Sequence, residues 1–425
     1  MPGYMRFDCR DLSRISQLYF HQNILSFPRR FYILCLLFLI WKAQFLAIVR
    51  KTILNFRNPI ELLIIVFLIL YSFVVINGYF LNYFNFHLNV INITFVLTIE
   101  IILFILFFEI KLTSYRKSII YCLVIFAIVF IYSLHNSPAF LPISYSVDAV
   151  HHYVLMDYLY IHESLPNLNN SYYMQEMVQY PYGPSLFTVY ISKIFRIELV
   201  ETMQILAFVV AGLLAVLAYL VSKELLIEYD LPTGYEEILS LVSPFMLFSV
   251  PIYFFGQYLN DSFYYSMIFG ELLVIGTLFT LLKIETSGHS KNNEKTWLNF
   301  YFILCLGIIY TYSLFLIIPL LAAAIWLSFN SNIRKLLNFK HIFIYTVLLA
   351  GLFIIYSLER FNIGKAILQN EGSAVVPYIS NFNPLFIILV ISGIFLYGIE
   401  NEDRIKRIAF IYVVVLFIET YVFLF

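Results

Sequence analysis

The feature that most constrains this fold is a succession of apolar runs, several of them about 20 residues long, which is the length that an α-helix needs to cross a bilayer. The first two are Ile60 to Phe80 and Leu88 to Phe108. Backbone polar groups in hydrocarbon must be satisfied within the segment, and a helix does this. Hydrophobic residues make up 61% of the 425 and charged residues 12%, against roughly 45–50% and 25% in soluble domains. The sequence therefore predicts an all-α, polytopic membrane protein.

The positions of Lys and Arg set the expected orientation of the helices. Three basic residues between positions 111 and 117 follow the second run, and basic turns favour the cytoplasmic side. Ser118 to Leu134 then crosses outward, which places residues 135–184 outside. This large loop has no Lys or Arg. Continuing along the chain predicts about eleven transmembrane helices, with further outer loops at residues 255–261 and 359–384.

We expect three regions in the chain. Residues 1–59 carry nine Lys and Arg around one apolar run, Phe31 to Val49. Cations on both flanks favour a helix lying in the cytoplasmic interface over a span. Residues 60–117 are predicted to form a transmembrane hairpin, and residues 118–425 the main transmembrane domain.

Two apolar runs do not have the length of a single span. Ser185 to Phe195 is too short to cross, so we expect a short helix in the outer interface, following the large outer loop. Leu298 to Phe329 is too long for one span and short for two, yet basic turns flank it on both sides. An even number of crossings, or a re-entrant pair, is predicted there.

The outer loop at residues 135–184 contains the strongest candidates for chemistry. A helix beginning near Ser146 or Val147 would put Asp148 in its first turn, where the helix dipole favours an ionised carboxylate. His151 and His152 follow three and four residues later, on the same helical face. The residues alone fit a general base with its orienting groups, a metal site, or a capping acid beside interfacial histidines.

The order of these motifs resembles that of the GT-C superfamily of membrane glycosyltransferases. Asp148-Ala-Val-His-His-Tyr and Tyr180-Pro-Tyr-Gly are similar to the acid, aromatic helix and Tyr-Pro-x-Gly turn in the first outer loop of the oligosaccharyltransferase catalytic subunit. The segment from Pro184 onward resembles part of the aminoarabinose and protein mannosyl transferases. Gly256-Gln-Tyr-Leu-Asn-Asp261 resembles the second acidic motif of the family. The likeness covers roughly residues 118 to 330, although the cations of the Tyr-Pro-x-Gly turn are missing here.

This resemblance implies a GT-C-like fold that transfers a sugar from a polyprenyl-phosphate donor to a glycan, lipid or protein acceptor. Such reactions build cell-envelope glycans or glycosylate proteins. Asp148 would be the general base or a metal ligand, with His151 or His152 as an orienting group or auxiliary ligand. Asp261 would be the second acid, and the two acids could share Mg²⁺ or Mn²⁺.

Substrate binding is predicted at four further positions, whereas two other acids of the loop are expected to be solvated. An outer cation could hold the leaving phosphate of the donor. The expected substrate-binding residues are Glu176, Tyr180, Arg360 and Lys365, and the expected solvated acids are Asp157 and Glu163.

A transporter or flippase of lipid-linked glycans is the alternative, followed by a membrane protein without catalysis. Transporters usually place ionisable groups near the bilayer midplane. We identify Glu100 as the one clear acid within an apolar run, while the other acids gather on outer loops, which favours the enzyme. The zero net charge implies no nucleic-acid partner. We expect a multi-pass protein of the cell membrane whose active-site loop is extracytoplasmic.

Overall fold

The computed structural model describes residues 52–56, 59–112, 116–136, 147–166, 181–226, 235–249, 265–286, 291–329 and 339–359. All of them belong to one unit of the chain, Arg50–Phe425. Most of these residues are helical, as predicted. The exception is a short parallel ladder in which β1 (Thr52–Phe56) pairs with β2 (Phe108–Leu112), with Thr52 opposite Phe108. The second strand takes up residues that were expected to end a span and begin a basic turn.

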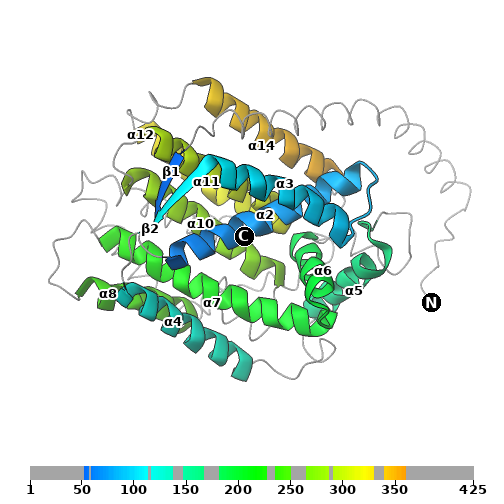
Figure 1. Cartoon of the computed structure of the whole chain (residues 1–425), viewed down its shortest axis with the longest axis horizontal. Helices are drawn as coiled ribbons and strands as arrows, with labels where there is room; N and C mark the ends of the chain where they lie inside the picture. Colours follow the sequence, from blue (N-terminus) through cyan, green and yellow to red (C-terminus); the bar gives the residue numbers. More distant parts are fainter. Residues whose placement is uncertain are drawn as a thin grey trace, which may run out of the picture. The chain divides into compact units, whose positions relative to one another are not determined.

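The α-helices of the described residues are shown in Figure 1. A 3₁₀ turn, η3 (Ser313–Leu316), separates two of them. The helices are α2 (Pro59–Tyr83), α3 (Val90–Phe107), α4 (Arg116–Asn136), α5 (Val147–His162), α6 (Gly183–Phe195), α7 (Leu199–Leu226), α8 (Tyr235–Ser249), α10 (Tyr265–Thr286), α11 (Lys291–Tyr312), α12 (Ile317–Phe329) and α14 (Phe339–Glu359).

Four of these helices are long and apolar enough to cross a membrane: α2, α7, α10 and the Lys117–Leu134 part of α4. The apolar parts of α3, α11 and α14 are shorter. Membrane-type helices are therefore confirmed in the described residues, while a total of about eleven crossings stays a prediction. The expected cytoplasmic interfacial helix at residues 31–49 and the outer loops at residues 255–261 and 359–384 lie outside the described residues, apart from Glu359.

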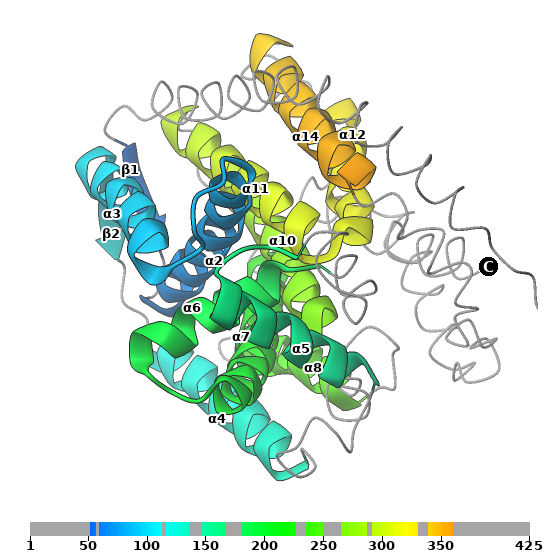
Figure 2. The ribbon, with the colours of Figure 1, turned by 90° about the vertical axis from the view of Figure 1, so that its right-hand side faces the viewer.

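Helix α10 packs against α11 and α7, and α2 packs against α11 (Figures 1 and 2). Helices α4 and α8 pack against α7. Glycines permit two of the close approaches. A Cβ at Gly276 of α10 would lie 2.8 Å from Leu68 of α2, and one at Gly212 of α7 would lie 2.6 Å from Phe126 of α4. Larger residues at these positions would push the helices apart.

One end of the bundle is held by three buried charges. Lys283 of α10 lies between Glu61, near the start of α2, and Glu224, near the end of α7. The Lys283 ammonium is 3.1 Å from the Glu61 carboxylate and also bonds the Glu224 carboxylate. No side chain of the three is more than 6% exposed. We call this end of α10 the Lys283 end and the opposite end the Tyr265 end.

Helices α11 and α12 form a hairpin that begins and ends at the Lys283 end. A short connection places the start of α11 beside the end of α10. Trp326 of α12 donates a hydrogen bond of 2.8 Å to Glu285, also near the end of α10. The 13 residues of α12 reach about 20 Å, short of the roughly 30 Å hydrocarbon core. The hairpin therefore returns to the end at which it began, and the number of times that it crosses the membrane stays a prediction.

Two helix boundaries differ from the sequence prediction. The apolar run that predicts a crossing begins at Ile205, but helix α7 begins at Leu199 and includes the polar residues Glu201, Thr202 and Gln204. Thr202, for example, is buried and donates a hydrogen bond of 2.9 Å to the carbonyl of Glu198. Helix α6 begins two residues earlier than expected, and its first eight residues are buried. Protein side chains therefore cover the first eight of its 13 residues, although the whole segment Ser185–Phe195 was expected in the outer interface.

Candidate functional site

Three segments that follow the predicted motifs meet at the Tyr265 end. His152 of α5 has its Nε2 3.4 Å from the Ser266 hydroxyl of α10, and its ring centroid is 5.8 Å from that of Tyr265. Thr188 of α6 shares a hydrogen bond of 2.6 Å with the Tyr265 hydroxyl. All four side chains are buried. We call His152, Thr188, Tyr265 and Ser266 the Tyr265 cluster.

Helix α5 begins at Val147, which confirms the predicted start and puts Asp148 in the first turn. The backbone position of Asp148 is one turn before His152 and therefore on the same helical face. That face is directed at α10, because His152 contacts Ser266. His151, one residue earlier, is half-buried, and Asp157 is exposed, as expected for a solvated acid.

The Tyr-Pro-x-Gly turn leads into α6 from inside the bundle. Gly183 packs so closely that an added Cβ would lie 2.7 Å from the backbone oxygen of Tyr310 in α11 and 3.0 Å from Val75 in α2. The Tyr182 ring is fully buried and stacks against that of Tyr79, with centroids 6.4 Å apart. The sequence predicted the turn and the helix but not this burial. Glycine is needed at position 183 because no side chain fits between α2 and α11 there.

The start of α6 leaves polar groups without partners in the described residues. No side chain caps the helix, and Pro184 occupies its first turn. The Ser185 hydroxyl is fully buried and makes no hydrogen bond there. A second hydroxyl pair lies nearby in the bundle, where Tyr71 of α2 bonds Thr311 of α11 over 2.8 Å. The polar contacts of this region are thus hydroxyl and imidazole groups.

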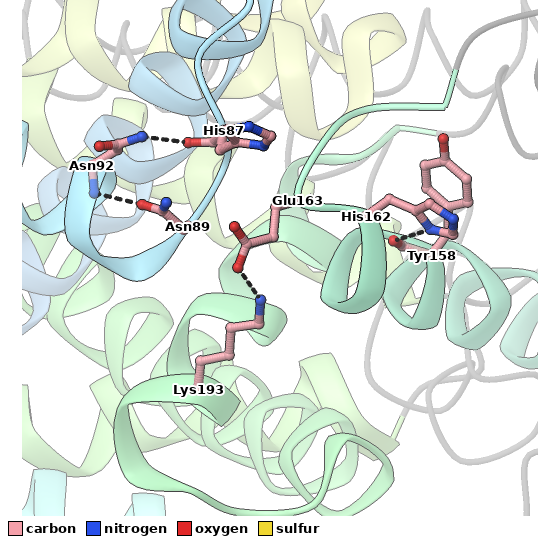
Figure 3. Close-up of polar contacts among 7 residues, drawn as sticks. All are labelled: His87, Asn89, Asn92, Tyr158, His162, Glu163 and Lys193. Atoms are coloured by element: carbon pink, nitrogen blue, oxygen red, sulfur yellow. Dashed lines mark hydrogen bonds and ion pairs between the residues drawn. The ribbon is translucent and has the colours of Figure 1, made fainter.

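Figure 3 shows a second polar region, which ties the end of α5 to its neighbours. Glu163 has a φ of 50° and ends the helix, and its carbonyl accepts a 2.6 Å hydrogen bond from the Leu88 amide. Its carboxylate pairs with Lys193 of α6 at 2.8 Å. Lys193 also lies 4.8 Å from the Tyr160 ring centroid. Glu163, expected to be merely solvated, therefore anchors the α5–α6 unit.

The same close-up shows two local contacts beside this anchor. The His162 ring stacks on Tyr158, with centroids 4.2 Å apart, and its Nδ1 lies 3.2 Å from the Tyr158 carbonyl oxygen. At the turn before α3, Asn92 donates 2.8 Å and 2.9 Å hydrogen bonds to the side chain of Asn89 and the carbonyl of His87. These contacts hold the helix ends and leave His162 outside the Tyr265 cluster.

Several predicted site residues lie outside the described residues: Glu176, Tyr180, Asp261, Arg360 and Lys365. Of Asp148, only the backbone position is described. Within the described part of the chain, no three His, Cys, Asp or Glu residues are grouped to hold a metal ion. The shared Mg²⁺ or Mn²⁺ between Asp148 and Asp261 therefore stays a prediction.

Sequence reasoning missed a second acid inside an apolar helix, so the description of Glu100 as the one clear case was wrong. Glu271 of α10 is only 6% exposed. An acid within the Ser262–Leu282 run was the signal that could have revealed it. Glu100 itself is buried and accepts a 2.8 Å hydrogen bond from Asn77. No feature of the sequence indicated that the hydroxyl groups of the Tyr265 cluster would meet.

Comparison with known proteins adds no family to this description. The chain matches no protein-family model, no curated protein and no solved structure. The class that the fold defines is a helical protein with membrane-length helices.

Proposed function

We propose that this protein is an integral-membrane glycosyltransferase that acts at the Tyr265 end, on the extracytoplasmic side of the cell membrane. The supporting observation is the convergence of three segments in the Tyr265 cluster. Helix α5 carries Asp148 in its first turn, α6 follows Tyr180, and α10 follows Asp261. The three motifs of the resemblance are therefore attached to helices that contact one another.

In the proposed reaction, an acceptor hydroxyl attacks the anomeric carbon of a polyprenyl-phosphate sugar. Its proton passes to the Asp148 carboxylate, the glycosidic C–O bond breaks, and the lipid phosphate leaves with the electron pair. His152 is a positioning residue, because its contact with Ser266 fixes the first turns of α5 against α10. Asp261 precedes Tyr265 by four residues, so the chain tethers it within about 14 Å of that residue.

The leaving phosphate requires positive charge or directed donors. Lys193 is the described cation of α6, but its ammonium is already paired with Glu163. Arg360 and Lys365 therefore remain the proposed phosphate-binding residues, with Glu176 and Tyr180 at the acceptor. A divalent ion held by Asp148 and Asp261 would stabilise the same charge.

The test uses the purified full chain in detergent with a panel of labelled polyprenyl-phosphate sugars. Asp148→Asn should abolish transfer without changing the melting temperature, because a first-turn acid contributes only about 0.3–1 kcal/mol through the helix dipole. Asp157→Asn, on an exposed face of the same helix, is the matched control and should keep full activity. Transfer retained by Asp148→Asn would refute the assigned base, and chelator sensitivity would distinguish metal-dependent from metal-free catalysis.

A second candidate, transport of a lipid-linked glycan, is favoured by the acids inside apolar helices. Glu100 and Glu271 are both buried in such helices, where ionisable groups often line a transport path. Proteoliposomes that contain a labelled lipid-linked sugar test this candidate. Movement of the label between leaflets without transfer to any acceptor would support the transporter over the enzyme.

A further inference from the structure

Four buried acids, Glu61, Glu100, Glu224 and Glu271, occur in three different settings. Glu61 and Glu224 flank the ammonium of Lys283, and Glu100 accepts a hydrogen bond from the Asn77 amide. Glu271 differs from all of these. Within the residues that the structure describes, no hydrogen bond or ion pair reaches its carboxyl group, although the residue is only 6% exposed.

Glu271 lies between the two ends of the bundle, about 9 Å along the α10 axis from Tyr265. It precedes Lys283 by twelve residues on α10, which corresponds to about 18 Å along the helix axis. Lys283 marks one end, because it contacts the third residue of α2 and the third residue from the end of α7. A depth of about 18 Å is close to the midplane of a hydrocarbon core about 30 Å thick.

Gly270, the residue before Glu271, packs against the turn of the α11–α12 hairpin. A Cβ on Gly270, the preceding residue, would lie 3.0 Å from Tyr312 at the end of α11 and 2.9 Å from Phe315 in η3. Met267 and Leu278, four residues before and seven after Glu271, share its helical face and are only half-buried. Glu271 therefore lies on the least tightly packed face of α10.

The helices that pack on α10 place their charged residues away from Glu271. Helix α12 and η3 contain no Asp, Glu, Lys, Arg or His. The Asp, Glu, Lys, Arg and His residues of the other helices that pack on α10 lie towards the two ends. They are Glu61 of α2, Glu201, Lys223 and Glu224 of α7, Lys291, Glu294 and Lys295 of α11, Lys193 of α6, and Asp148, His151, His152, Asp157 and His162 of α5. The titratable groups between the ends include Cys305 and the tyrosines Tyr71, Tyr310 and Tyr312.

We propose that Glu271 is a proton-binding site in the middle of the membrane, where it takes up and releases a proton as the protein works. A carboxylate without a partner is costly in a low-dielectric interior. A proton is the ligand that balances its charge without requiring a cavity or a second protein group. The proposal goes beyond sugar transfer, because that reaction uses no group at this depth of the bundle.

The experiment uses dicyclohexylcarbodiimide, an apolar reagent that reacts with protonated carboxyl groups, on the purified full chain. The acid proton moves to a carbodiimide nitrogen, the carboxyl oxygen adds to the central carbon, and the acyl group migrates to nitrogen, so that nothing leaves. Peptide mass spectrometry should find Glu271 modified at least about tenfold more than the partnered Glu100 and Glu224, with modification falling as the pH rises. Equal or absent modification of Glu271 would overturn the proposal.

Two variants complete the test. Glu271→Gln should lose the modified peptide, whereas Glu100→Gln, the matched control with a partnered acid, should keep it. Modification of the unaltered protein decides the outcome even if a variant does not fold. Because Asp148 supplies the proposed base, Glu271→Gln should retain sugar transfer to an acceptor in detergent. Glu271→Gln should lose carbodiimide modification and keep transfer, whereas Asp148→Asn should lose transfer and keep the modification of Glu271. These two results separate this proposal from the proposed function.

Discussion

The two ends of the α2–α7–α10 bundle are joined by different chemistry. At the Lys283 end, one ammonium and two carboxylates connect three helices in a buried ionic contact. At the Tyr265 end, hydroxyl and imidazole groups of the Tyr265 cluster connect α5, α6 and α10. Breaking a buried ion pair leaves a charge without compensation, whereas a neutral hydrogen bond has a net value of only about 1 kcal/mol. We therefore expect the contacts at the Lys283 end to be the more costly to break, and the Tyr265 end to rearrange more easily.

The largest effect on stability is expected for a substitution at the Lys283 end. Lys283→Met leaves Glu61 and Glu224 buried without their cation and should destabilise the protein by about 3–5 kcal/mol. The melting temperature in detergent measures this loss. The triple variant Lys283→Met, Glu61→Gln, Glu224→Gln is the control and should recover most of it, since no charge remains. A single variant that melts like the unaltered protein would show that the ionic contact is not what holds this end.

A smaller loss is expected for Gly183→Ala, which tests the turn that enters the bundle at the Tyr265 end. The new methyl group would meet the Tyr310 backbone at 2.7 Å, and overpacking of this kind costs about 1–3 kcal/mol. Gly78→Ala is the matched control. Its methyl group would meet the tip of the Leu186 side chain at 2.1 Å, which can rotate away. Equal melting temperatures for the two variants would contradict a rigid α6 turn.

Substitutions in the Tyr265 cluster should lower stability less than those at Lys283 and Gly183. Thr188→Val removes the hydroxyl that bonds Tyr265 and should lower stability by about 1 kcal/mol. A double-mutant cycle with Tyr265→Phe measures the interaction energy of the two hydroxyls. Once Thr188 is replaced, Tyr265→Phe should lower stability little further, because the hydrogen bond is already lost. A coupling as large as that of the Lys283 triad would remove the distinction between the two ends.

The smallest effect is expected at the half-exposed ion pair between Lys193 and Glu163. Glu163→Gln should cost less than about 1 kcal/mol, because solvent screens a pair at the surface. The Tm difference from the unaltered protein should shrink further in high salt, where exposed charges are screened over a shorter distance. A loss that is independent of salt would indicate that the Glu163 backbone contacts, rather than the ion pair, had been disturbed.

Much of the helical structure could be predicted from the sequence, because long apolar runs in a membrane leave few alternatives. Ile60 to Phe80 became α2 (Pro59–Tyr83), and the start of α5 at Val147 followed from the local capping pattern. The strand β2 was not predicted, since pairing with β1 depends on a segment more than fifty residues away. Local propensity does not contain such long-range contacts.

The candidate site, too, could be predicted from the sequence only in part. The helical face of His152 was predictable from its spacing to Asp148, but the partner Ser266 was not, because it lies 114 residues away. The burial of Gly183 depends likewise on α2 and α11. Glu271 stands in an apolar run of the sequence, but the structure was needed to show that it is buried with no hydrogen-bond or ion-pair partner among the described residues.

The pairing of β1 with β2 fixes an order of events during synthesis. Thr52 leaves the ribosome 56 residues before its partner Phe108, so β1 has no ladder partner until α2 and α3 have both been made. The predicted hairpin of α2 and α3 is therefore complete before the ladder closes. Because β1 and β2 flank that hairpin and lie side by side, closure also requires the chain to return to the side from which it entered. The ladder thus joins, in the finished protein, the segments that precede α2 and follow α3.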